Sequence, residues 1–116
     1  MENEKIIELI YQGDIISAYE HVSALTPQEI YKIIRDKALE ESDITFYGFF
    51  VHLLLHRPSN EIESIHYHAA VLLGFDLRAV SGAYDLAEYH TKEAIKLDPE
   101  NKQYLKFLYH LRGIPR

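Results

Sequence analysis

One stretch of the chain, residues 82–101, constrains the fold more than any other. It begins with a glycine, which lets a chain turn between two antiparallel helices. Ala87 and Ala94 follow, and a small side chain at each allows the facing helices to approach closely. Near the end stand Asp98, which can cap a following helix, and Pro99, which fits the first turn of one. The pattern predicts a helical hairpin followed by a further helix.

This stretch resembles the second half of a tetratricopeptide (TPR) repeat. The family places small residues where this chain has Gly82, Ala87 and Ala94, and its repeats end like Leu97-Asp98-Pro99-Glu100-Asn101. The family's repeats are pairs of helices that form a binding scaffold, so the resemblance implies this fold and a binding role but no particular chemistry.

The repeat that this match belongs to covers residues 61–98. Leu73-Gly74 matches the Leu-Gly pair of its first helix, but the spacing departs from the family's. Gly74 precedes Gly82 by eight residues, where the family has seven. Residues 75–81 are therefore either a longer connection or a bent helix end.

Helical periodicity also covers the rest of the chain, and no segment has a convincing two-residue alternation. We expect a single domain over residues 1–116, all-α, built as a TPR-like stack of three antiparallel hairpins and a C-terminal capping helix. The seven expected helices cover residues 3–12, 15–25, 27–39, 44–56, 61–74, 84–97 and 99–112.

Cap residues define several of these helices. Thr26, Pro27 and Glu29 have the pattern of a capping box with proline in the first turn. Asp43 is the expected N-cap of the helix over 44–56, and Asn60 with the glutamate three residues later predicts a second capping box.

The helix over 44–56 is apolar on almost every side. Its aromatic residues would also suit a strand, but the stop at Pro58 and its helical neighbours favour a helix. A helix of this kind is either buried on several sides or covers an interface. We expect it at the centre of the fold, and a second copy of the chain could cover it in a homodimer.

The charge of the chain is acidic and uneven. The net charge is −6, which argues against nonspecific nucleic-acid binding. Residues 1–63 hold twelve acids and five bases, whereas residues 64–116 hold six acids and seven bases. An acidic half could attract a basic protein partner or simply favour solubility.

The sequence predicts a cytoplasmic protein. It contains no cysteine, which suits a reducing compartment. Its first residues lack the basic and apolar segments of a signal peptide. The longest apolar run, residues 46–55, is far shorter than the roughly 20 residues that span a membrane, so no membrane partner is expected.

Residues for catalysis or metal binding are hard to find. The chain has no cysteine, five scattered glycines, and no nucleophile elbow or phosphate-binding loop. His52 and His56 would share a helix face as two metal ligands do, but no third ligand is evident. His66 and His68 would point to different sides of a helix. We expect no enzymatic activity, no metal and no cofactor; an enzyme or metal protein based on the histidines is the third hypothesis.

Nine tyrosines suggest a contact surface, because tyrosine is enriched in protein interfaces. Each of them could also pack in the core with a wet hydroxyl. The predicted contact set combines acids with the tyrosines in or near the acidic half. Its members are Tyr31, Asp36, Glu40, Glu41, Asp43, Tyr47, Glu61, Glu63 and Tyr67.

The run from Ile65 to Leu108 resembles small stand-alone TPR-like proteins of bacteria. Such proteins often serve as immunity partners of polymorphic or contact-dependent toxins, many of them nucleases with basic clefts. The resemblance therefore implies a protein that binds and neutralises a toxin, and an acidic surface would suit a basic toxin domain. The alternative is an adaptor that holds a peptide or helix of a cytoplasmic partner in its concave groove.

Overall fold

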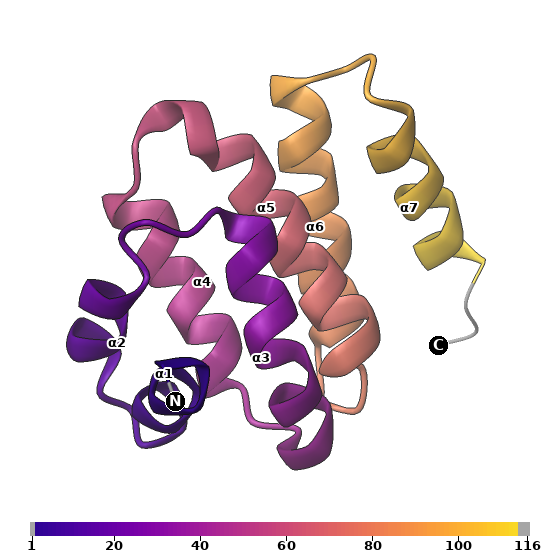
Figure 1. Cartoon of the computed structure of the whole chain (residues 1–116). Helices are drawn as coiled ribbons and strands as arrows, with labels where there is room; N and C mark the ends of the chain where they lie inside the picture. Colours follow the sequence, from indigo (N-terminus) through magenta and orange to yellow (C-terminus); the bar gives the residue numbers. More distant parts are fainter. Residues whose placement is uncertain (1, 114–116) are drawn as a thin grey trace.

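The computed structural model describes residues 2–113, which form seven α-helices and no strand (Figure 1). The prediction of an all-α fold is therefore confirmed. The helices are α1 (Glu2–Tyr11), α2 (Ile15–His21), α3 (Pro27–Glu41), α4 (Thr45–His56), α5 (Ile62–Val71), α6 (Ala83–Leu97) and α7 (Lys102–Arg112). Two short turns adjoin α5, the 3-10 turn η1 (Ser59–Glu61) and the π-helical turn η2 (Leu72–Asp76).

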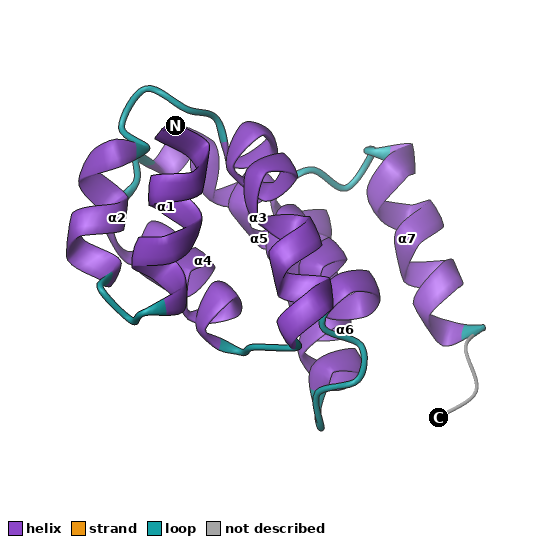
Figure 2. Ribbon diagram, turned by 60° about the horizontal axis from the view of Figure 1, so that its bottom comes forward, coloured by secondary structure: helices purple, strands orange, loops and turns teal. Residues whose placement is uncertain are grey.

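Four central helices form two layers, and the other three helices lie at the two edges of these layers (Figure 1 and Figure 2). In Figure 1, α3 and α5 lie side by side in front and run in the same direction, with α4 and α6 behind them. Figure 2 shows the same layers from below, with α1 and α2 at one edge and α7 at the other. The most extensive contact between two helices is that of α5 with α6. The front layer and α7 therefore share one face of the molecule.

The start of α3 is fixed by the predicted capping box. The backbone N–H of Glu29 donates to Thr26 Oγ1 at 3.1 Å, and the backbone N–H of Thr26 donates to Glu29 Oε1 at 2.9 Å. At the other end, Ser42 adopts a left-handed conformation with φ of 51°. Asp43 then accepts hydrogen bonds from the backbone N–H and the hydroxyl of Thr45, at 2.9 and 2.7 Å. The expected N-cap is nevertheless one residue early, because α4 begins at Thr45 and its N-cap residue is Ile44, which makes no side-chain cap bond.

Two other expected caps are wrong. The box at Asn60 does not form, because the N–H of Glu61 donates to the Pro58 carbonyl in η1 and α5 begins only at Ile62. The chain therefore enters α5 through a 3-10 turn, without a side-chain cap. Asp98 does not cap the last helix either. Asn101 does, and α7 begins at Lys102 rather than at residue 99.

The segment between Gly74 and Gly82 begins as a bent helix end, η2, and continues from Leu77 as a connection of turns, so each expected alternative describes part of it. In η2 the N–H of Leu77 donates to the Leu72 carbonyl at 2.8 Å, a wide turn that takes up one residue more than an α-helical turn. Gly82 then has a φ of 83°, which glycine adopts without strain. Gly74 lies against α7, and a Cβ there would meet side-chain atoms of Leu111 and Phe107 at 3.0 and 3.1 Å.

Helix α4 packs against α1, α2 and α5 and remains exposed along its outer side. Phe46, Phe49 and Leu53 are buried, whereas Leu55 is 73% exposed. The expectation that this helix is buried on several sides is therefore met in part. Its cover by a second copy stays a prediction, and none of the described helices is long and apolar enough to cross a bilayer.

Candidate functional site

The face shared by α3, α5 and α7 holds a groove of about 200 Å³. This volume accommodates one or two side chains rather than a whole small molecule. The groove, called the α3–α5–α7 groove below, is lined by Gln28, Tyr31, Lys32, Arg35, Tyr67, His68, Val71 and Gln103.

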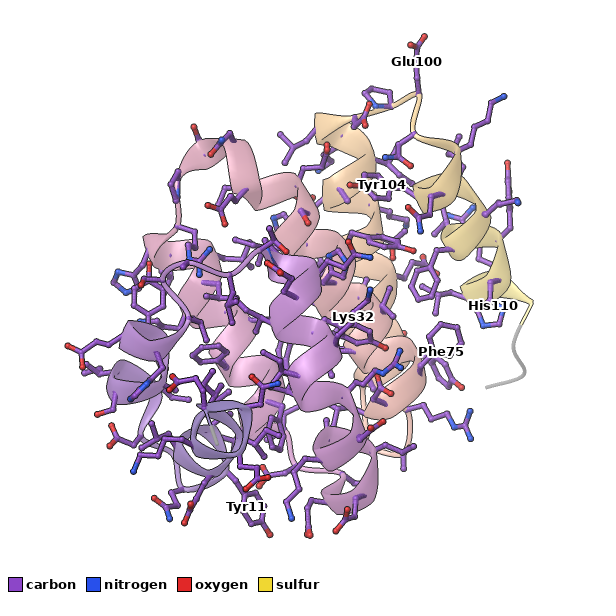
Figure 3. All side chains as sticks on the ribbon, viewed as in Figure 1. Tyr11, Lys32, Phe75, Glu100, Tyr104 and His110 are labelled. Carbon is purple, nitrogen blue, oxygen red and sulfur yellow. The ribbon has the colours of Figure 1, made fainter. Side chains whose placement is uncertain are left out.

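Aromatic rings follow one another across the groove from α3 to α7. The ring centroids of Tyr31 and His68 are 5.9 Å apart, and those of His68 and Tyr67 are 5.2 Å apart. Tyr67 then packs against Tyr104 at 4.7 Å and Phe107 at 5.9 Å. Figure 3 labels Tyr104 on the side of α7 that faces the rest of the bundle. Tyr104 and Phe107 are buried behind this row, so the rings that line the groove are those of Tyr31, His68 and Tyr67. Such rings offer a rigid contact area to a ligand.

A hydrogen bond holds Tyr31 in place at one side of the groove. Its hydroxyl donates to Asp76 Oδ2 at 2.7 Å, across 45 residues of sequence. Burial, together with the neighbouring Asp76 carboxylate, raises the pKa of Tyr31 well above its usual range, and Arg35 opposes this effect. Burial also raises the pKa of Asp76. Tyr31 therefore remains a neutral donor that is already bound to its partner.

The exposed polar groups of the groove are basic or neutral. Lys32 and Arg35 are exposed one turn apart on α3, and Figure 3 shows Lys32 on the side of α3 that faces α5. Two amides, Gln28 and Gln103, stand exposed on α3 and α7. Two cations beside aromatic rings are suited to a negatively charged or aromatic side chain.

His68 is a neutral part of this lining. Its Nδ1–H donates to the backbone carbonyl of Ser64 at 2.8 Å, which leaves Nε2 as the unprotonated nitrogen. Burial lowers its pKa, and the nearby Lys32 adds to this effect. Because Nδ1 is occupied by the carbonyl, it does not act as a base toward the Ser64 hydroxyl.

The predicted contact set does not form one surface. Only Tyr31 and Tyr67 lie in the groove. Tyr47 lies between α4 and α6, where its hydroxyl is hydrogen-bonded to His90 Nε2 at 2.7 Å.

Four predicted acids lie at the end of α3, which we call the acidic end. They are Asp36, Glu40, Glu41 and Asp43. Glu41 accepts a hydrogen bond from the Tyr11 hydroxyl at 3.1 Å and pairs with Lys37 at 3.4 Å. Asp43 is bonded to Thr45, while the exposed Asp36 and Glu40 lie 4.0 and 3.8 Å from Arg35 and Lys37. Basic neighbours therefore neutralise part of this charge.

The last two acids bind within the molecule, at the start of α5. Glu61 accepts a hydrogen bond from Arg57 at 2.7 Å. Burial and the nearby Glu63 raise the pKa of Tyr104 on α7 to about 12, which places Glu63 beside that ring. A binding role for the acids of the contact set stays a prediction.

Several groove residues were missing from the sequence prediction, notably Gln28, Lys32, Arg35 and His68. A signal for them existed. Gln28, Tyr31, Lys32 and Arg35 follow the i, i+3, i+4, i+7 spacing of one helix face, but this face is polar and so escapes a search for apolar periodicity.

Metal-binding arrangements are absent from residues 2–113, where no three His, Asp or Glu side chains come together as ligands. His52 and His56 do lie together, with ring centroids 4.2 Å apart, but their third neighbour is the ring of Tyr19.

Comparison with models of protein families, with curated proteins and with solved structures finds no match to this chain. The resemblance to TPR repeats therefore depends on the residues quoted above and on no relative.

Proposed function

We propose that this chain is a non-catalytic protein-binding module that binds a segment of a partner protein in the α3–α5–α7 groove. The observation that carries the proposal is the row of rings from Tyr31 through His68 to Tyr67, which the buried Tyr104 of α7 supports from behind and which lies beside the exposed cations Lys32 and Arg35.

The lining also suggests the chemistry of the bound segment. An aromatic or apolar side chain would pack on Tyr67 and Val71, while a neighbouring carboxylate would pair with Lys32 or Arg35. The groove is small, so one anchoring side chain would dominate the affinity, as is common in interfaces. This is the adaptor role expected of a TPR-like scaffold with a concave face.

A toxin-neutralising role is the second candidate, and the acidic end of α3 favours it. Asp36 and Glu40 are exposed there, next to Glu41. A basic toxin domain would be attracted by this charge. The two candidates differ in the surface that the partner touches and in the sign of its charge.

The test is co-purification of the tagged protein from its native host, with bound proteins quantified by mass spectrometry. A parallel bait carries Lys32→Glu and Arg35→Glu, and a matched control bait carries Lys92→Glu and Lys96→Glu on α6. We expect one stoichiometric partner on the unaltered and control baits and its loss from the groove bait.

Equal recovery on all three baits would contradict binding in the groove. A partner that is the basic C-terminal domain of a large secreted protein, recovered by the groove bait but lost after Asp36→Lys and Glu40→Lys, would support the toxin-neutralising role instead.

A further inference from the structure

On the side of the bundle away from the groove, a chain of hydrogen bonds joins three helices. The hydroxyl of Tyr47 on α4 lies 2.7 Å from His90 Nε2 on α6. The other ring nitrogen of His90, Nδ1, lies 2.9 Å from Nδ1 of His66 on α5. These three side chains are called the His90 network below.

His90 is almost completely removed from water, with a relative exposure of 2%. Both of its ring nitrogens face a partner, so the network leaves no unpaired atom on this ring. A fully paired polar group of this kind is stable in a core only while its protonation state fits its partners.

The Nδ1–Nδ1 contact permits only one proton between the two rings. If His90 carries it, its Nε2 accepts from the Tyr47 hydroxyl; if His66 carries it, His90 donates through Nε2 to the Tyr47 oxygen. Both arrangements satisfy the contact with two neutral rings. When both rings are protonated, two N–H groups face each other and the hydrogen bond is lost.

We propose that the His90 network is an acid-sensitive contact, which joins α4, α5 and α6 while at least one of the two histidines is neutral and opens when both take up protons. The surroundings of the network favour the neutral state. Burial and the neighbouring His66 lower the pKa of His90 to about 4, and burial lowers the pKa of His66.

The other titratable groups around the network have little effect on the preference of the two histidines for the neutral state. On α6, Glu93 favours protonation of both histidines, but it also pairs with Lys96 at 2.8 Å. Tyr89 packs its ring against His66 and His90. Burial, together with Tyr89, raises the pKa of Tyr47, so Tyr47 keeps its proton. Helix α4 itself carries no Asp, Glu, Lys or Arg between Thr45 and His56.

The sign of the pH dependence follows from the lowered pKa of His90. In the unfolded chain this ring takes up a proton near the ordinary histidine pKa of 6.5, whereas in the folded chain it does so only near 4. The contribution of neutral His90 to folding is complete above pH 6.5 and is lost as the pH falls from 6.5 to 4.

Urea unfolding at pH 7 and pH 4 tests this dependence. Between these values the unfolding equilibrium constant of the unaltered protein should rise roughly a hundredfold more than that of a His90→Gln variant. The control is His110→Gln, which removes an exposed histidine of α7 and should keep the wild-type response. Equal pH responses of the unaltered protein and His90→Gln would overturn the proposal.

A second measurement needs no variant. Histidine ring signals are followed by NMR as the pH is lowered. We expect His90 to titrate near pH 4 and His66 to report the same opening, while a titration of His90 near 6.5 in the folded protein would overturn the proposal.

The network also bears on the groove, because α5 carries His66 on one side and Tyr67 and His68 towards the groove. Opening of the network should loosen this wall and release a bound partner in acid. This consequence rests on the proposed function, whereas the unfolding and NMR measurements do not involve a partner and so can fail or succeed separately.

Discussion

The two ends of α3 present opposite charge and opposite degrees of organisation. The first turns place Tyr31, Lys32 and Arg35 beside rings from α5 and α7. The last turn and the loop after it form the acidic end, where the acids bond to near neighbours or stand exposed. The first region is a candidate site because three helices contribute to it, whereas the charge of the second comes from one segment of the chain.

The comparison shows why acidic composition alone does not identify a surface that is open to a partner. An acidic side chain is available to a partner only when it is not already paired with another group of the same molecule. Glu61 is bound by Arg57, and Glu41 by Tyr11 and Lys37. The groove has two exposed cations next to its rings, Lys32 and Arg35, although Arg35 also lies 4.0 Å from Asp36.

The largest effect is expected from Arg57, the partner of Glu61. Its guanidinium is buried, and besides Glu61 it donates to the carbonyls of Leu25 and Val22 at 3.0 and 2.7 Å. Arg57→Met should therefore lower the free energy of unfolding by about 2–4 kcal/mol, measured by urea unfolding.

The control is Arg78→Met, an exposed position that should change stability by less than about 0.5 kcal/mol. A similarly small loss for Arg57→Met would mean that Glu61 is free to contact a partner, and would return it to the acidic contact surface.

The next effect concerns α7, which completes the groove but lies apart from the acidic end (Figure 1). Gly74→Leu would drive a side chain into Leu111 and Phe107, displace α7 and lower stability by about 1–3 kcal/mol. Partner binding in the groove should fall with it, as measured by calorimetry.

Gly48→Ala is the matched control, because a Cβ at this exposed position of α4 meets nothing within 4 Å. It should raise stability by up to about 1 kcal/mol. If Gly74→Leu were as harmless as Gly48→Ala, the close packing of α7 on this turn would be refuted.

The smallest expected changes in stability come from substitutions at the two ends of α3. Thr26→Ala removes the capping box and should cost about 1 kcal/mol. Ser42→Gly relieves a φ of 51° at the other end and should stabilise by up to about 1 kcal/mol. Thermal and urea unfolding measure both, and the same sign of change in both variants would contradict this account of the ends.

Local features of the fold could be predicted from the sequence. Thr26, Pro27 and Glu29 form the capping box that their spacing indicates, and Gly82 makes its turn. Asp98 and Asn101 show the limit of such patterns. Both residue types are favourable N-caps, and they stand three residues apart. The local pattern does not show that Asn101, rather than Asp98, caps α7.

The site could not be predicted in the same way, because it depends on contacts distant in sequence. Tyr31 meets Asp76 across 45 residues, and Tyr47 meets His90 across 43. Nothing near Tyr47 in the sequence shows that its hydroxyl is occupied. The polar stripe of α3 can be recognised in the sequence. That this stripe lines a groove follows only from the rings that α5 and α7 place beside it.

The most direct test of the central claim is the affinity of the co-purified partner for two double variants of α3, measured by calorimetry at low and high salt. Lys32→Glu with Arg35→Glu changes the groove, and Asp36→Lys with Glu40→Lys changes the acidic end by the same number of charges. We predict at least a tenfold loss, roughly 1.4 kcal/mol, for the groove variant and an unchanged affinity for the other. The reverse result, with affinity lost only at the acidic end, would contradict the account and favour capture of a basic partner.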